Sequence, residues 1–217
     1  KDDNKTIETY SASIPAQGQT PNESGELKVV FLPQNISSIA VSPDGKKIFY
    51  LTEFSGGALG FISNTLNEGK QQIFNSPLTE WSASWPQEKT IFLTTKPSGG
   101  INGYSFSLNT TNKVFEKILS GAGLTSLVSP NGKLILFSNS GETGIALALY
   151  DIKNKTTRTL SPRTLPEKCV WTLDSAKIYC AVPANIISSK LPDEWYQGRF
   201  FFSDRIWLIN PADGSGS

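Results

Sequence analysis

The chain has 217 residues, and its 20 Lys and Arg residues nearly balance its 19 Asp and Glu residues, which leaves a net charge of +1. This balance lacks the basic stretch of a nucleic-acid-binding protein and the acidic bias of a solvating tail, so we expect no nucleic-acid partner. The sequence contains no His, which excludes Ser-His-Asp catalysis, Cys-His catalysis and His-ligated zinc within this segment.

Residues 1–26 are polar and rich in turn-forming residues, and we interpret them as a linker or a loosely held tail. The sequence has no Met and begins at Lys1, which indicates a mature or excised fragment. No run of about 20 apolar residues occurs, so we expect membrane attachment only through an anchor upstream of Lys1.

A turn motif recurs along the rest of the chain. Its second residue falls at positions 43, 86, 130 and 173, so the steps are 43, 44 and 43 residues. Pro at the second position fixes φ, and Asp-Gly or Asn-Gly supplies residues that tolerate positive φ. The copies are Ser42-Pro43-Asp44-Gly45-Lys46, Trp85-Pro86-Gln87-Glu88-Lys89, Ser129-Pro130-Asn131-Gly132-Lys133 and the degenerate Thr172-Leu173-Asp174-Ser175.

Each turn lies between a short apolar stretch and an alternating one, as in a β-hairpin, and two further strands complete each repeat. Four strands per repeat of this length predict an all-β fold, a partial β-propeller of about four blades of four antiparallel strands. The predicted repeats lie near 27–76, 77–120, 121–163 and 164–217. The last is incomplete, with Arg205–Ile209 as its third strand and only a turn over 211–217. Leu27–Leu32 are predicted to form the last strand of a blade that the far end of the ring completes.

The Ser-Pro-Asp-Gly-Lys turn and the following strand Ile48–Leu51 make residues 27–217 resemble TolB-like, WD-repeat-like propellers of bacterial envelope proteins. The stretches 165–171, 179–183 and 193–198 resemble uncharacterised exported propellers of uncultured bacterial lineages, which look like single-pass anchored proteins. The resemblance implies an extracytoplasmic location, in the periplasm or at the cell surface. It supplies no catalytic residues.

The two cysteines lie in the fourth hairpin. If Thr172 pairs with Lys177, Cys169 stands opposite Cys180, close enough for a disulfide. The alternative is two reduced cysteines that serve as small core residues. The resemblance to exported proteins favours the disulfide, because such bonds are rare in the cytosol. Two thiols without His make a metal site an unfavourable interpretation.

The fourth repeat also carries an insertion between its second and third strands, over residues 183–204, where earlier repeats use only a few residues. One hypothesis is a lid or partner-docking loop with aromatic anchors beside charged groups. The alternative is that Phe200–Phe202 extend a strand and the aromatic rings pack onto the neighbouring blade. The candidate binding residues are Asp193, Glu194, Trp195, Tyr196, Arg199 and Phe200.

Three carboxylates resemble catalytic groups only in isolation. Asp44 and Asp174 occupy turn positions and Asp151 ends a strand, so structural roles are favoured, and no spacing suggests a pair across a groove. We expect no catalytic residue, metal or cofactor in this segment.

The resulting hypothesis is a monomeric, non-catalytic, exported propeller that binds a protein or an envelope polymer. Its alternative is the substrate-gating propeller of a larger hydrolase, such as a prolyl-oligopeptidase-type peptidase, whose Gly-x-Ser-x-Gly elbow would lie outside this chain. A propeller lyase or lactonase with a metal in its channel is a third alternative, which the lack of His disfavours.

Overall fold

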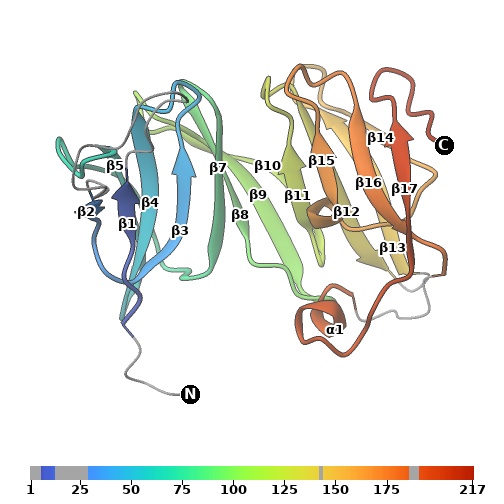
Figure 1. Cartoon of the computed structure of the whole chain (residues 1–217), viewed down its shortest axis with the longest axis horizontal. Coiled ribbons are helices and arrows are strands. Elements are labelled where there is room, and N and C mark those ends of the chain that lie inside the picture. Colours follow the sequence, from blue (N-terminus) through green and yellow to red (C-terminus); the bar gives the residue numbers. More distant parts are fainter. Residues whose placement is uncertain (1–5, 13–28, 142–143, 186–190) are drawn as a thin grey trace, which may run out of the picture. The chain divides into compact units, whose positions relative to one another are not determined.

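Antiparallel sheets provide nearly all the regular structure in the computed structural model, which describes residues 6–12, 29–141, 144–185 and 191–217. The chain divides into two compact units, residues 1–83 and residues 84–217. Figure 1 shows the sheets of each unit. Among the described residues, no helix is long and apolar enough to cross a membrane.

The first unit contains a two-stranded sheet and the first blade. Strand β1 (Tyr10–Ala12) pairs with β2 (Val29–Phe31), so part of the segment that we interpreted as a tail forms a strand. In the first blade, strands that are neighbours in the sheet are also neighbours in the sequence. Its buried cluster consists of Leu32, Ile36, Ile48 and Tyr50. Its strands are β3 (Ile36–Val41), β4 (Lys47–Phe54), β5 (Gly57–Asn64) and β6 (Gln71–Ser76).

Three further sheets follow, and the first strand of the second blade crosses the boundary between residues 83 and 84. The second blade consists of β7 (Trp81–Gln87), β8 (Thr90–Thr95), β9 (Asn102–Asn109) and β10 (Phe115–Ala122). The third consists of β11 (Thr125–Val128), β12 (Leu134–Gly141), β13 (Gly144–Asp151) and β14 (Thr156–Thr159). After the 3₁₀ turn η1 (Pro166–Lys168), the fourth consists of β15 (Cys169–Trp171), β16 (Ile178–Pro183) and β17 (Asp204–Ile209).

The fourth blade differs from its prediction at the C-terminal end. Residues 211–217 do more than turn, because Gly216 forms a bridge with Ile209 and the backbones of Leu208 and Ser217 exchange two hydrogen bonds. These residues lie alongside β17, where the other blades have their fourth strand.

Three of the four copies of the recurring turn share one set of hydrogen bonds. In the fourth blade the Thr172 hydroxyl donates to Asp174 Oδ1 at 2.6 Å and accepts the Lys177 N–H at 3.0 Å. Ser42 and Ser129 do the same in the first and third blades. The position that is Gly in those two turns is Ser175 here, also with positive φ (60°). The Asp carboxylate of the first and fourth copies, and the Asn131 amide oxygen of the third, therefore hold a turn.

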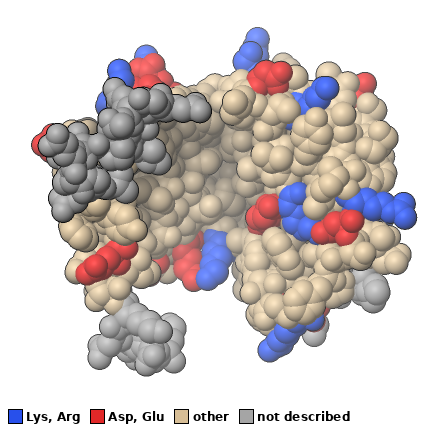
Figure 2. Space-filling model, viewed as in Figure 1, with Lys and Arg blue, Asp and Glu red and all other residues tan. Residues whose placement is uncertain are grey.

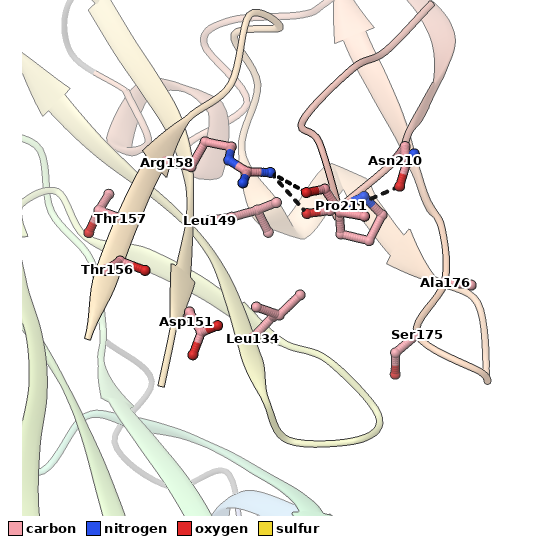
Figure 3. A pocket seen from close by; sticks show the side chains of 11 residues that line it. Leu134, Leu149, Asp151, Thr156, Thr157, Arg158, Ser175, Ala176, Asn210 and Pro211 are labelled. Atoms are coloured by element: carbon pink, nitrogen blue, oxygen red, sulfur yellow. Dashed lines mark hydrogen bonds between the residues drawn. The ribbon is translucent and has the colours of Figure 1, made fainter. Parts of the chain in front are cut away.

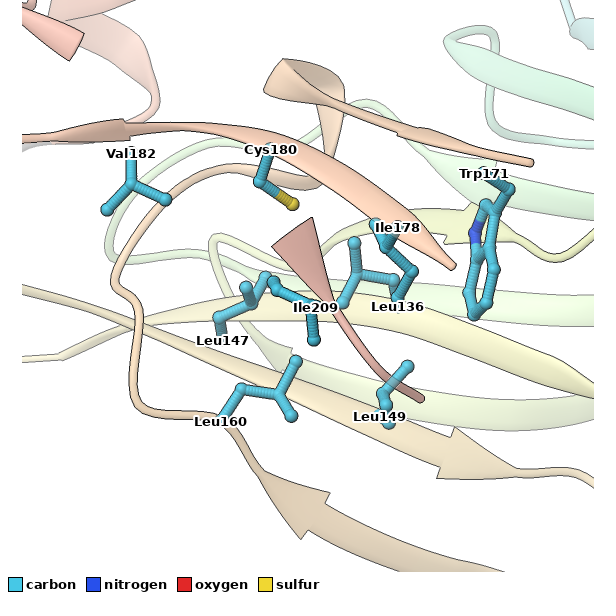
Figure 4. Packing of buried hydrophobic residues seen from close by; sticks show 9 residues of the cluster. All are labelled: Leu136, Leu147, Leu149, Leu160, Trp171, Ile178, Cys180, Val182 and Ile209. Atoms are coloured by element: carbon cyan, nitrogen blue, oxygen red, sulfur yellow. The ribbon is translucent and has the colours of Figure 1, made fainter. Parts of the chain in front are cut away.

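The core of the second unit lies between its blades. One face of the third blade, with Ile135, Phe137 and Ala148, packs with Phe92 of the second blade. The opposite face meets the fourth blade in a cluster that Figure 4 shows from close by, with Leu136 and Leu147 fully buried beneath Ile178. Alternate residues of one strand thus serve two interfaces, as the period of a β-strand requires.

Candidate functional site

The insertion, residues 183–204, leaves the fourth blade at the end of β16 and returns at β17. Its described part contains one short helix, α1 (Asp193–Tyr196), which Figure 1 shows at the end of the sheets away from the β15–β16 turn. Five of the six candidate residues lie on this helix or in the turn that follows it, and Phe200 lies just beyond that turn.

Three aromatic rings of the insertion point inward. Trp195, Phe200 and Phe202 pack against a buried cluster of Ile145, Leu165 and Leu191. The rings also contact one another, with centroids 4.9 Å apart for Phe200 and Phe202 and 6.1 Å apart for Trp195 and Phe202. Phe200–Phe202 do not form a strand, since β17 begins only at Asp204. Trp195 and Phe200 therefore anchor the insertion to the third blade, where Ile145 lies on β13.

Polar contacts fix the start of α1 to two other blades. The Asp193 carboxylate accepts a hydrogen bond from the Gly99 N–H, in the β8–β9 loop, and the Ser140 hydroxyl donates to the Leu191 carbonyl. A Cβ at Gly99 would lie 2.8 Å from the Leu191 carbonyl oxygen, so only glycine allows this approach without a shift. Asp193, a candidate binding residue, thus helps to hold the loop in place.

A second set of contacts ties the insertion to η1 and β17. The Tyr196 hydroxyl donates to the Glu167 carboxylate. Burial, together with the negative charge of Glu167, raises the pKa of Tyr196 far above its usual value, so the phenol stays protonated. Lys168 Nζ lies 2.6 Å from Asp204 Oδ1 and 3.6 Å from the centroid of the Phe202 ring. Burial lowers the pKa of Lys168, an effect that its bond with Asp204 opposes.

The outer surface of the insertion carries exposed side chains, of which Tyr196 also holds Glu167 through its hydroxyl. Tyr196 is 45% exposed and Phe201 is 84% exposed, and Arg199 is also exposed. Phe201 lies within the predicted loop but outside the six chosen residues. Neighbouring side chains of an extended chain alternate in direction, but which of the three Phe rings turn inward depends on the cluster around Ile145, so the sequence gives no signal that singles out Phe201.

Charge does not concentrate into a patch of one sign on the face of the molecule that Figure 2 shows. Basic and acidic side chains are interspersed there, with wide areas of other residues between them. The described part of the chain contains no group of three or more His, Cys, Asp or Glu residues that could hold a metal ion.

The two cysteines form a disulfide between the first two strands of the fourth blade. The register places Cys169 directly opposite Cys180, with their Cα atoms 4.0 Å apart, and Thr172 N–H donates to the Lys177 carbonyl as the predicted hairpin requires. Cys180 is buried in the cluster between the third and fourth blades. The disulfide thus joins β16, which contributes Cys180 to this cluster, to the neighbouring strand β15.

The remaining carboxylates of interest hold turns. Asp44 and Asp174 bond to the hydroxyl and backbone N–H groups of their own turns, and these bonds lower the pKa of each carboxyl group. Asp151 accepts bonds from the backbone and side chain of Asn154, which lower its pKa as well. The contacts of the three carboxylates are thus with hydroxyl, amide and backbone N–H groups of their own turns, which are structural roles.

Neither a family model nor a curated protein matches the sequence. Solved structures do match. TolB from Acinetobacter baumannii has a TM-score of 0.60 at 14% identity, with 87% of this chain and 44% of that chain covered. Putative TolB from Agrobacterium tumefaciens has a TM-score of 0.60 at 14% identity, with coverage of 98% and 69%. The β-propeller domain of the Trilobed protease from Pyrococcus furiosus has a TM-score of 0.57 at 10% identity, with coverage of 88% and 58%.

These matches and the repeated four-stranded sheets define the fold as a β-propeller, present here as a partial one of about four blades. Among propellers, the chain resembles the TolB-like group, as its turn motif predicts. The chain spans less than half of the length of the Acinetobacter TolB chain. At these identities the matches establish the fold alone, since propellers host unrelated functions.

Proposed function

We propose that this chain is a non-catalytic binding propeller of an exported protein, and that it binds a partner protein through the outer surface of the insertion. The observation that carries the proposal is the contrast within one loop. Trp195, Phe200 and Phe202 fix it against the blades, whereas Phe201 and Arg199 project into solvent. An exposed aromatic residue and an Arg on a rigid support are typical of interface hot spots.

The disulfide supports an extracytoplasmic location, because such bonds persist in oxidising compartments and are rare in the cytosol. An envelope polymer is the second class of partner that this surface could bind. The proposal of no catalysis rests on the structural use of Asp44, Asp151 and Asp174 in turns.

The second candidate is a propeller that gates substrate access to a hydrolase domain in a longer protein. The likeness to the propeller domain of the Trilobed protease favours it, although that likeness extends to the fold alone. In this case the insertion would face a domain of the same protein.

Site-specific photo-crosslinking tests the first proposal. A photoreactive phenylalanine analogue replaces Phe201 in one variant and Leu173 in a control. Leu173 is 94% exposed and lies in the β15–β16 turn, at the opposite end of the same blade. We expect one separate protein to be crosslinked from position 201 and not from 173, and the adduct to be lost on Arg199→Glu. A crosslink to another domain of the same polypeptide would support the gate, and equal crosslinking from both positions would refute both.

A further inference from the structure

A cavity of about 740 Å³ lies between the third and fourth blades, at the end of the sheets away from the insertion. Asp151 at the end of β13 lines it, whereas Ile145 at the start of the same strand contacts the cluster under α1. Figure 3 shows its lining from close by, with Leu134 and Leu149 between the β14 side chains and the segment 210–212. The cavity is thus separate from the candidate site.

The cavity lies where the fourth blade has a smaller apolar side chain than the third blade. Tyr150 and Ile209 occupy matching places, opposite Ile135 and Ile178 in their hairpins. Two residues after Tyr150, Ile152 packs into the apolar cluster between the second and third blades. At the matching position the fourth blade has Pro211, which lines the open cavity.

Polar groups from separate segments converge on this space. Arg158 Nη1 donates to the carbonyl oxygen of Ala212 at 2.6 Å and to that of Pro211 at 3.5 Å, which holds one wall. The charge of Arg158 also interacts with the Asp213 carboxylate, and the guanidinium has further N–H donors besides those of Nη1. Ser175 Oγ accepts the Asn131 N–H at 3.0 Å, so its hydroxyl proton remains free to donate.

Strands β13 and β14, which carry Arg158 on the same side of the cavity, supply acceptors and hydroxyl groups as well. Asp151 uses one hydrogen bond on each carboxylate oxygen for Asn154, at 2.8 and 2.9 Å, and each oxygen can accept more. Thr156 lies opposite Asp151 in the β13–β14 ladder and also lines the cavity, as does Asn210. Donors and acceptors therefore surround an apolar floor.

We propose that this cavity binds a neutral saccharide of one or two sugar units. One cation and one anion, Arg158 and Asp151, leave the lining without net charge, so an ionic ligand would meet a like charge. Planar carboxylate, amide and guanidinium groups bond well to neighbouring hydroxyls, each of which both donates and accepts. Leu134 and Leu149 cover the C–H face of a sugar ring, and the volume lies in the range of small-molecule sites.

Saturation-transfer NMR on the full chain tests the proposal, with cellobiose, maltose and N,N′-diacetylchitobiose as probes at millimolar concentration. We expect at least one to bind. Ala176→Trp should abolish this binding, because Ala176 is exposed at the rim and its turn does not depend on a small side chain. Thr156→Val should weaken binding about fivefold, which corresponds to one lost hydrogen bond.

The matched control is Thr159→Val, on the same strand but outside the cavity lining. It should leave the affinity unchanged, and circular dichroism should show that all variants are folded. The proposal is overturned if none of the three sugars binds, if binding survives Ala176→Trp, or if both threonine variants weaken it equally. Binding of a Gly-Ser peptide in place of the sugars would also overturn it.

Discussion

Reduction of the Cys169–Cys180 disulfide should destabilise the second unit by a measurable and calculable amount. The bond closes a short loop, since the two residues are 11 positions apart. The chain-entropy relation for a loop of this length gives about 3 kcal/mol of stabilisation at 25 °C. For a chain of this size, a change of that magnitude lowers the melting temperature by roughly 6–12 °C.

Urea unfolding of the full chain with and without a thiol reductant provides the assay. The free energy of unfolding of the second unit should fall by about 3 kcal/mol in reductant. The variant with both Cys169→Ala and Cys180→Ala should be insensitive to the reductant. A change below about 1 kcal/mol in the parent protein would show that the hairpin is already ordered in the unfolded chain, and the reasoning would be wrong.

Two further predictions concern the anchoring of the insertion. Gly99→Ala should destabilise the fold by about 1–3 kcal/mol, because the new Cβ of residue 99 would press on the Leu191 carbonyl. The segment 183–204 should then become more sensitive to limited proteolysis, and an unchanged digestion pattern would contradict the contact. Tyr196→Phe should cost about 1 kcal/mol near neutral pH through the lost bond to Glu167. Because the pKa of Tyr196 is raised in the folded protein, this contribution is complete below pH 10 and declines as the pH rises further. The free energies of unfolding of the parent protein and Tyr196→Phe should therefore converge at alkaline pH. A difference that stays constant with pH would refute the assignment.

The repeat and its hairpins could be predicted from the sequence because their causes are local. The first turn depends on Pro43, on Gly45 with its positive φ, and on the bond from the Ser42 hydroxyl to Asp44, all within a few positions of one another. A hairpin turn of known length also fixes the register, so the pairing of Thr172 with Lys177 places every residue of β15 opposite its partner on β16.

The parts that could not be predicted depend on distant partners. Tyr10–Ala12 form a strand only because Val29–Phe31 pair with them. The directions of Phe200 and Phe201 follow from the position of Ile145, on another blade. Similarly, the cavity beside Pro211 lies at the junction of two blades, and the sequence of a single repeat does not show how two blades pack together.

The most direct test of the account is the affinity of the purified crosslinked partner for the intact chain and two variants. Phe201→Ala should weaken binding about 30-fold or more, as expected for a hot-spot residue worth about 2 kcal/mol, and Leu173→Ala should leave it unchanged. Equal affinities of the parent protein and Phe201→Ala would contradict the assignment of the insertion as the binding surface.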